Sequence, residues 1–265
     1  MGRDYNGIIR ASAARMENQP PKFFVLLARQ EDRDPMPLAK ALASARQPPL
    51  QDQMMTAKNS WGILAENLSE ADARHLVESL QTAGVESIAK PAESLATLAK
   101  AEPAATMESI PTSQLVLIAA AAITTTSTTT KSVKEGPNAA QKVLSTAILL
   151  GTGLPIKIGG KERIVEKTQT HSDLAFFVDL LYKDPPRRLR VDALHFNYAF
   201  LKERKLYQGL GNFKLLVGDL VKAVPEAWKN HGTRVFMENK PLQTMGYGSL
   251  ADLERETRWL LTLIG

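Results

Sequence analysis

Apolar residues over positions 22–90 of this 265-residue chain follow two different spacings. Residues 22–29, 61–66 and 85–91 are short apolar runs of strand length. Between them, residues 37–59 and 69–84 repeat apolar side chains every three or four positions, which is typical of amphipathic helices. The pattern predicts the element order β-α-β-α-β.

The second helix has the strongest local signals. Ser69 and Asp72 have the spacing of a capping box, in which two side chains satisfy the first free amides of a helix. Gly84 follows the last periodic residue and supplies a C-terminal stop. These signals predict helix boundaries close to 69 and 84.

This element order, with its Ser, Glu and Asp-Ala opening and Ala-Gly closing, resembles the C-terminal domain of the bacterial ribosomal stalk protein. That fold is shared with the Clp-protease adaptor, and the resemblance implies a bacterial domain that docks partners and runs no chemistry. The stalk domain binds translation-factor GTPases through a stretch rich in Gly and Lys. Residues 47–54 lack both residue types, so the resemblance does not imply binding of those factors.

The rest of the chain is also predicted to contain both helices and strands. Alanine-rich residues 92–112 contain two prolines and predict a linker with one or two helical turns. An apolar run over 115–123 continues into the tract Thr124 to Thr130, for which a long bent strand, a pair of strands and a disordered linker are all open. Further patterns predict a helix over 137–150, a hairpin over 154–167, an apolar run over 174–182, a strand or bent strand pair over 187–201, and helices over 206–224 and 249–264.

We therefore expect an α+β protein with two domains. A mobile arm over 1–21 precedes an adaptor-like domain over 22–91. A linker over 92–112 then leads to an α+β domain over 113–265, for which we expect a mainly antiparallel sheet. No family resemblance is found for this second domain.

The composition limits the chemistry and the cellular compartment that we expect for the chain. The chain has no cysteine, which excludes disulfides and thiol chemistry. Its longest apolar run is nine residues, against the roughly 20 that a membrane-spanning helix needs, and residues 1–7 lack the apolar core of a signal peptide. We expect a cytoplasmic protein without a membrane partner.

Protein docking is the leading functional expectation. Leu50, Met54 and Met55 lie on the first predicted helical run, and flexible methionine side chains suit adaptable binding grooves. Burial of the same methionines in the core is an equally open interpretation. The sequence does not identify the partner or the oligomeric state.

Nucleic-acid binding is the alternative. Lysine and arginine balance aspartate and glutamate over residues 1–100, twelve against twelve, so the net charge of +5 comes from the rest of the chain. On an unbroken strand over 187–200, basic and aromatic side chains would share one face and could contact phosphates and bases. The candidate contacts are Arg187, Arg188, Arg190, Phe196, Tyr198, Lys202, Arg204 and Lys205. The other interpretation is that the aromatic residues belong to the core and the arginines lie at its rim.

An enzyme of unknown class is the third expectation, without assigned catalytic residues or cofactors. The glycines at 151, 153, 159 and 160 lack the spacing of a phosphate-binding loop. His171 with Asp173, and Asp192 with His195, supply only two ligands each, so we predict no metal site. His75 and His195 are expected to be structural, and His231 is expected near a helix C-terminus.

Overall fold

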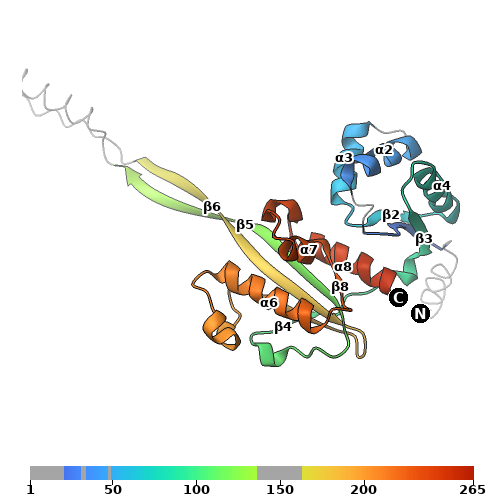
Figure 1. The fold of residues 1–265 in the computed structure, drawn as a ribbon. Helices are drawn as coiled ribbons and strands as arrows, with labels where there is room; N and C mark the ends of the chain where they lie inside the picture. The colour runs from blue at the N-terminus through green and yellow to red at the C-terminus, as the bar shows by residue number, and fades with distance from the viewer. Residues whose placement is uncertain (1–20, 31–33, 47–48, 136–162) are drawn as a thin grey trace, which may run out of the picture. The chain divides into compact units, whose positions relative to one another are not determined.

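A computed structural model describes residues 21–30, 34–46, 49–135 and 163–265. The chain is of the α+β class, with one antiparallel sheet and one mixed sheet (Figure 1). It divides into two compact units, residues 1–123 with 175–265, and residues 124–174. Residues 1–20 of the predicted arm over 1–21, the predicted helix over 137–150 and the predicted Gly159-Gly160 turn lie outside the described residues.

The first sheet has three antiparallel strands in the order β2-β1-β3. The predicted helical run over 37–59 is divided in two, because Pro49 has an extended ψ of 141° at the start of the second helix and proline cannot continue a preceding one. The elements are β1 (Phe23–Leu27), α2 (Pro35–Arg46), α3 (Leu50–Asn59), β2 (Ile63–Leu68), α4 (Glu70–Thr82) and β3 (Ser87–Pro91).

The central strand β1 is covered on both faces. Phe24, Val25, Leu26 and Leu27 are all buried, although successive side chains of a strand point to opposite sides. Helices α2, α3 and α4 lie on one side of the sheet, and α8 (Leu250–Ile264) contributes cover from the other (Figure 1). The continuous apolar run of β1 is therefore explained by cover from two directions.

The start of α4 agrees with the prediction. The Ser69 hydroxyl accepts a hydrogen bond from the amide of Asp72 at 3.2 Å, and the helix begins at the next residue, Glu70. Gly84 follows the helix with a φ of +81°, a conformation that glycine adopts without a steric penalty. Local signals alone were sufficient to place this helix.

The second sheet has five strands in the order β4-β7-β6-β5-β8. Strand β7 pairs antiparallel with β6 and parallel with the short edge strand β4, while β8 pairs parallel with β5. The threonine tract lies within one long strand, β5. The strands are β4 (Ala101–Pro103), β5 (Leu115–Glu135), β6 (Arg163–Tyr182), β7 (Arg187–Asp192) and β8 (Trp228–Lys229).

Helices follow and interrupt these strands. Phe176 of β6 lies against Phe213 and Phe236, with ring centroids 6.0 and 6.4 Å apart, so an aromatic cluster joins the strand to two helices. Residues 92–112, predicted as a linker, contain the short helices η2 (Ala92–Ser94) and η3 (Met107–Ser109) as well as strand β4. The later helices are η4 (Tyr198–Arg204), α6 (Gly209–Ala223), α7 (His231–Met237) and η5 (Leu242–Met245). Among the described residues, none of the helices has the length and apolarity to cross a membrane.

Helix α8 joins the two sheets of the first unit. Ser249 and Asp252 form a capping box at its start, where the predicted helix over 249–264 begins. Trp259 is fully buried, and its indole Nε1 donates a hydrogen bond to the Leu27 carbonyl of β1 at 2.8 Å. Residues 22–91 and 175–265 thus share one continuous buried core.

Gly62 should be intolerant of a side chain. A Cβ atom there would lie 1.9 Å from Cδ2 of Trp259, and the φ of +86° is strained for any other residue. We expect Gly62→Ala to lower the free energy of unfolding by about 2–5 kcal/mol, since overpacking and left-handed strain add. Denaturant unfolding measures this loss.

Gly84→Ala is the matched control. Its φ of +81° is nearly the same, but nothing lies within 4 Å of the new Cβ. We expect a loss of about 1–2 kcal/mol from backbone strain alone. Equal losses in the two variants would show that the contact with Trp259 does not restrict position 62.

Candidate functional site

The predicted docking residues lie on α3, in different environments. The exposed fractions of Leu50 and Met55 are 45% and 57%, whereas Met54 is half-buried and packs against the core. Gln53 and Ala57 mark the inward face of the helix. Met55, midway between them, points to the opposite side because two residues turn a helix by roughly 200°.

Helix α2 adds a residue that the sequence pattern did not single out. Met36 has an exposed fraction of 46% at the start of this helix. Lys40 and Lys58 are exposed and lie one helical turn after Met36 and Met55 respectively. By contrast, the leucines of α4, Leu76 and Leu80, are both buried.

The predicted basic and aromatic strand face is not formed. Strand β7 ends at Asp192, whose carboxylate accepts a hydrogen bond from the amide of Leu194 at 2.9 Å and so turns the chain. Phe196 and Tyr198 lie beyond that turn and are buried, with their rings packed edge to face at 5.2 Å. The prediction of a strand through residue 200 is wrong, and these rings belong to the core.

Arg188 and Arg190 occupy a buried ion cluster. Both guanidinium groups bind the Asp179 carboxylate, at distances from 2.5 to 2.9 Å, and both also contact Glu254 of α8. The strand register brings them together, since Asp179 pairs directly with Arg190 on the neighbouring strand. Arg188 is only 3% exposed, so its charge is used within the fold.

The other predicted basic residues lie outside this cluster. Arg187 forms an exposed salt bridge with Glu102, and Arg204 of η4 forms one with Asp219, each at 2.7 Å. Lys202 and Lys205 are exposed beside Arg204. The basic residues predicted to contact nucleic acid therefore do not share one surface. They lie at an exposed strand end, in the buried ion cluster and on a surface turn.

Removing Asp179 should destabilise the protein strongly. Asp179→Ala leaves two guanidinium groups without their shared carboxylate, and breaking a buried ion pair costs about 3–5 kcal/mol. Asp219→Ala breaks the exposed pair with Arg204 and should cost no more than about 1 kcal/mol. Denaturant unfolding of both variants at pH 7 measures the contrast, and comparable losses would contradict a structural role for the buried cluster.

Glu254 should make the stability of this cluster depend on pH. Burial alone would raise its pKa, but hydrogen bonds and charges from Arg188 and Arg190 outweigh burial and lower the pKa from its ordinary 4.5. The stabilisation is therefore present above pH 4.5 and is lost as the pH falls through the lower pKa of the folded state.

We expect the difference in unfolding free energy between the parent and Glu254→Gln to be constant near neutral pH. It should shrink as the pH falls below 4.5, because Glu254 then binds a proton and resembles glutamine. Denaturant unfolding at a series of pH values tests this. A difference that grows toward acid would contradict the assigned sign.

In the described part of the chain, the histidines do not belong to a metal-binding cluster. Asp192 and His195 are within hydrogen-bond distance, 2.8 Å, on an exposed turn. His231 lies at the first position of α7 and not near a helix C-terminus, so that expectation is wrong. Within the described part of the chain, no group of three or more potential ligands could hold a metal ion, and the His171 side chain lies outside the described side chains.

A buried polar network joins β5, α7 and α8. Asn230 caps α7 through the amide of Thr233, and its side-chain amide donates to the Ala120 carbonyl at 3.0 Å and to Glu256 at 3.2 Å. The Tyr247 hydroxyl donates to Glu256 as well. Sequence reasoning missed this network, although Asn230 followed three residues later by Thr233 could have indicated a helix start.

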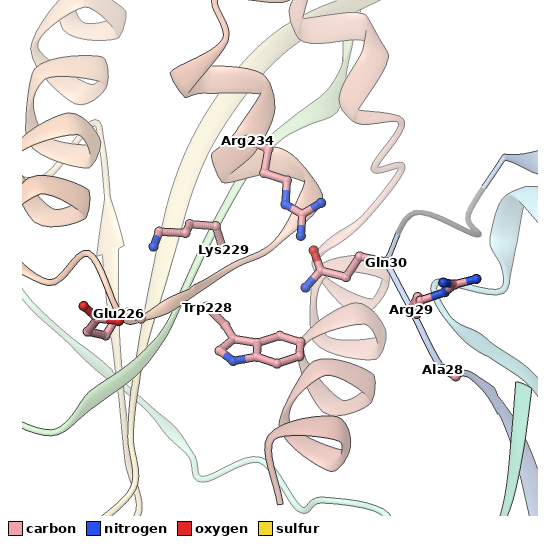
Figure 2. A pocket seen from close by; sticks show the side chains of 8 residues that line it. Ala28, Arg29, Gln30, Glu226, Trp228, Lys229 and Arg234 are labelled. Atoms are coloured by element: carbon pink, nitrogen blue, oxygen red, sulfur yellow. The ribbon is translucent and has the colours of Figure 1, made fainter. Parts of the chain in front are cut away.

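A cleft of about 340 Å³ was also missed by sequence reasoning. It lies where the residues after β1 approach β8 and α7 (Figure 2). Its polar and aromatic lining consists of Arg29, Gln30, Glu226, Trp228, Lys229 and Arg234. The lining comes from two segments that are distant in the sequence, 28–30 and 226–234, and no local pattern joins these segments.

Comparisons of the chain with family models, with curated proteins and with solved structures find no match. The resemblance of residues 22–90 to the ribosomal stalk domain thus stays a prediction.

Proposed function

We propose that the chain is a protein-interaction module that docks a partner through the outer surface of α2 and α3. The observation that carries this proposal is the exposure of Met36, Leu50 and Met55 on two adjoining helices. Single exposed apolar residues are common on protein surfaces, whereas a contiguous group of them marks an interaction site. The stalk-like resemblance expected for residues 22–90 supports the same conclusion.

The chemistry of this surface favours an amphipathic helix as the partner. Methionine side chains are flexible and adapt to the apolar stripe of such a helix. Lys40 and Lys58 lie one helical turn from exposed methionines, and two carboxylates lie near them as well, Asp52 and Asp34, the second of which accepts a hydrogen bond from the Met36 amide at 3.1 Å. The described part of this surface therefore combines exposed apolar side chains with two lysines and two carboxylates, which suits an amphipathic helix.

The geometry gives less support to nucleic-acid binding through residues 187–205. Arg188, Phe196 and Tyr198 are buried, so the strand face on which that function depended is absent from the described residues. Lys202 and Lys205 remain exposed but are not accompanied by those rings.

Site-specific photocrosslinking in the cell that makes the protein tests the docking surface. A photoreactive phenylalanine analogue replaces Met55, and a matched variant replaces the exposed Glu78 of α4. We expect a discrete crosslinked product at position 55 and none at 78, because only the first surface docks the partner. Peptide mapping of the product should identify an amphipathic segment.

A second variant tests the apolar contacts. Leu50→Glu in the Met55 crosslinking background should reduce the product at least about tenfold, because a carboxylate would be buried against the partner's apolar stripe. Circular dichroism checks that the variant is folded. Equal products from positions 55 and 78, or a product unaffected by Leu50→Glu, would overturn the proposal.

A further inference from the structure

Strands β5 and β6 are much longer than the strands that flank them. In the described sheet, β8 pairs with β5 only at Leu117 and Ile118, and β7 pairs with β6 only from Phe177 onward. Both long strands continue beyond these contacts into the second compact unit. Residues 124–135 of β5 and 163–174 of β6 therefore form a two-stranded ribbon (Figure 1).

In the first unit, side chains of α7 and its cap close the outer edge of β5. The Ala120 amide donates to Oδ1 of Asn230 and to the Thr233 hydroxyl, both at 3.0 Å, and the Ala120 carbonyl accepts from the Asn230 side-chain amide. Two residues earlier, the Ile118 carbonyl accepts from the Asn230 backbone amide. Since backbone groups of a strand alternate in direction, the even-numbered residues of β5 direct their N–H and C=O groups away from β6.

The outer edge of β6 follows the same alternation. The Phe176 carbonyl accepts from the Ala193 amide at 2.9 Å, just beyond the pairing of β6 with β7. The even-numbered residues of 164–174 thus direct their backbone groups away from β5. Among the described strands, none pairs with the outer edge of residues 124–135 or of residues 163–174.

The sequence of these edges does not oppose further strand pairing. Proteins commonly block an open strand edge with proline, with charged side chains or with a covering helix. Residues 124–130 contain no proline and no charged residue, and six of the seven are β-branched threonines. Residues 168–172 likewise contain no proline, lysine, arginine, aspartate or glutamate. Because a lone two-stranded ribbon is only marginally stable in water, a further strand on each outer edge would stabilise it.

We propose that further copies of this chain supply those strands, with the β5 edge of one copy paired to the β6 edge of the next. The two edges match in length, since residues 124–135 and residues 163–174 are twelve residues each. Every copy carries one edge of each kind, so a single type of contact satisfies both edges of every copy. Such a head-to-tail contact repeats around an axis and leaves no open edge once the ring of copies is closed.

Sedimentation velocity of the full chain over a series of protein concentrations tests the proposal. We expect the monomer to convert into one discrete larger species as the concentration rises, because a closed ring has a fixed number of copies. Hydrogen–deuterium exchange with residue-level fragmentation, on the same samples, locates the contact. The even-numbered amides of 124–134 and 164–174 should exchange at least about tenfold more slowly in the larger species, whereas the amides of β1 should be unchanged.

Proline variants test the backbone contact directly. Thr126→Pro removes an outward amide of β5 and Thr168→Pro removes one of β6, and neither removes a donor within the ribbon. Each should weaken association at least about tenfold, because a carbonyl of the next copy loses its hydrogen bond. Thr126→Val is the matched control, since it keeps the amide and the β-branched shape and should associate like the parent. Circular dichroism checks folding, and the exchange measurement on the parent decides the outcome if a proline variant is unfolded.

Three results would overturn the inference. The first is a chain that stays monomeric at every concentration. The second is association that leaves exchange of the ribbon amides unchanged, which would place the contact elsewhere on the protein. The third is protection of the outward amides that is equal at every concentration, which would show that these edges are covered within one chain. The ribbon contains no residue of α2 or α3, so none of these results decides the crosslinking at position 55.

Discussion

The packing of Trp259 against Gly62 and β1 is the contact on which the first unit depends. The indole is fully buried, fills the space above a glycine that has no side chain, and donates a hydrogen bond to the Leu27 carbonyl. Without this contact, the face of β1 turned toward α8 would be exposed to water. The three-stranded sheet therefore completes its core with a residue that lies 232 positions away in the sequence.

Helix α8 makes a different kind of contact on each of its faces. Glu254 reaches Arg188 and Arg190 of β7, while Glu256 accepts from Tyr247 and Asn230 in the buried network. Arg255 donates to the Ser60 and Ile63 carbonyls, at 2.9 and 3.0 Å, beside β2. One helix thus fixes both sheets through ion pairs, polar contacts and apolar packing, which makes their shared core continuous.

The sequence predicts those features that local chemistry controls. The predicted helix starts at 69 and 249 are confirmed, and the α+β class followed from the two hydrophobic spacings. The burial of Arg188 could not be predicted, because it depends on the strand register that places Asp179 opposite Arg190. The cleft could not be predicted from the sequence either, because Gln30 and Trp228 come together only when the two sheets have packed. Exposure of Met55 was one of two open alternatives, and only the position of the buried Gln53 distinguishes them.

The long separation between Leu27 and Trp259 has a consequence for how the chain folds. Strands β1, β2 and β3 emerge early in synthesis, but their uncovered apolar face must wait for residue 259 before it is protected from water. Folding that depends on such distant contacts is slow, and its intermediates expose surfaces prone to aggregation. The nascent chain therefore keeps an apolar face of β1 uncovered until α8 has been made.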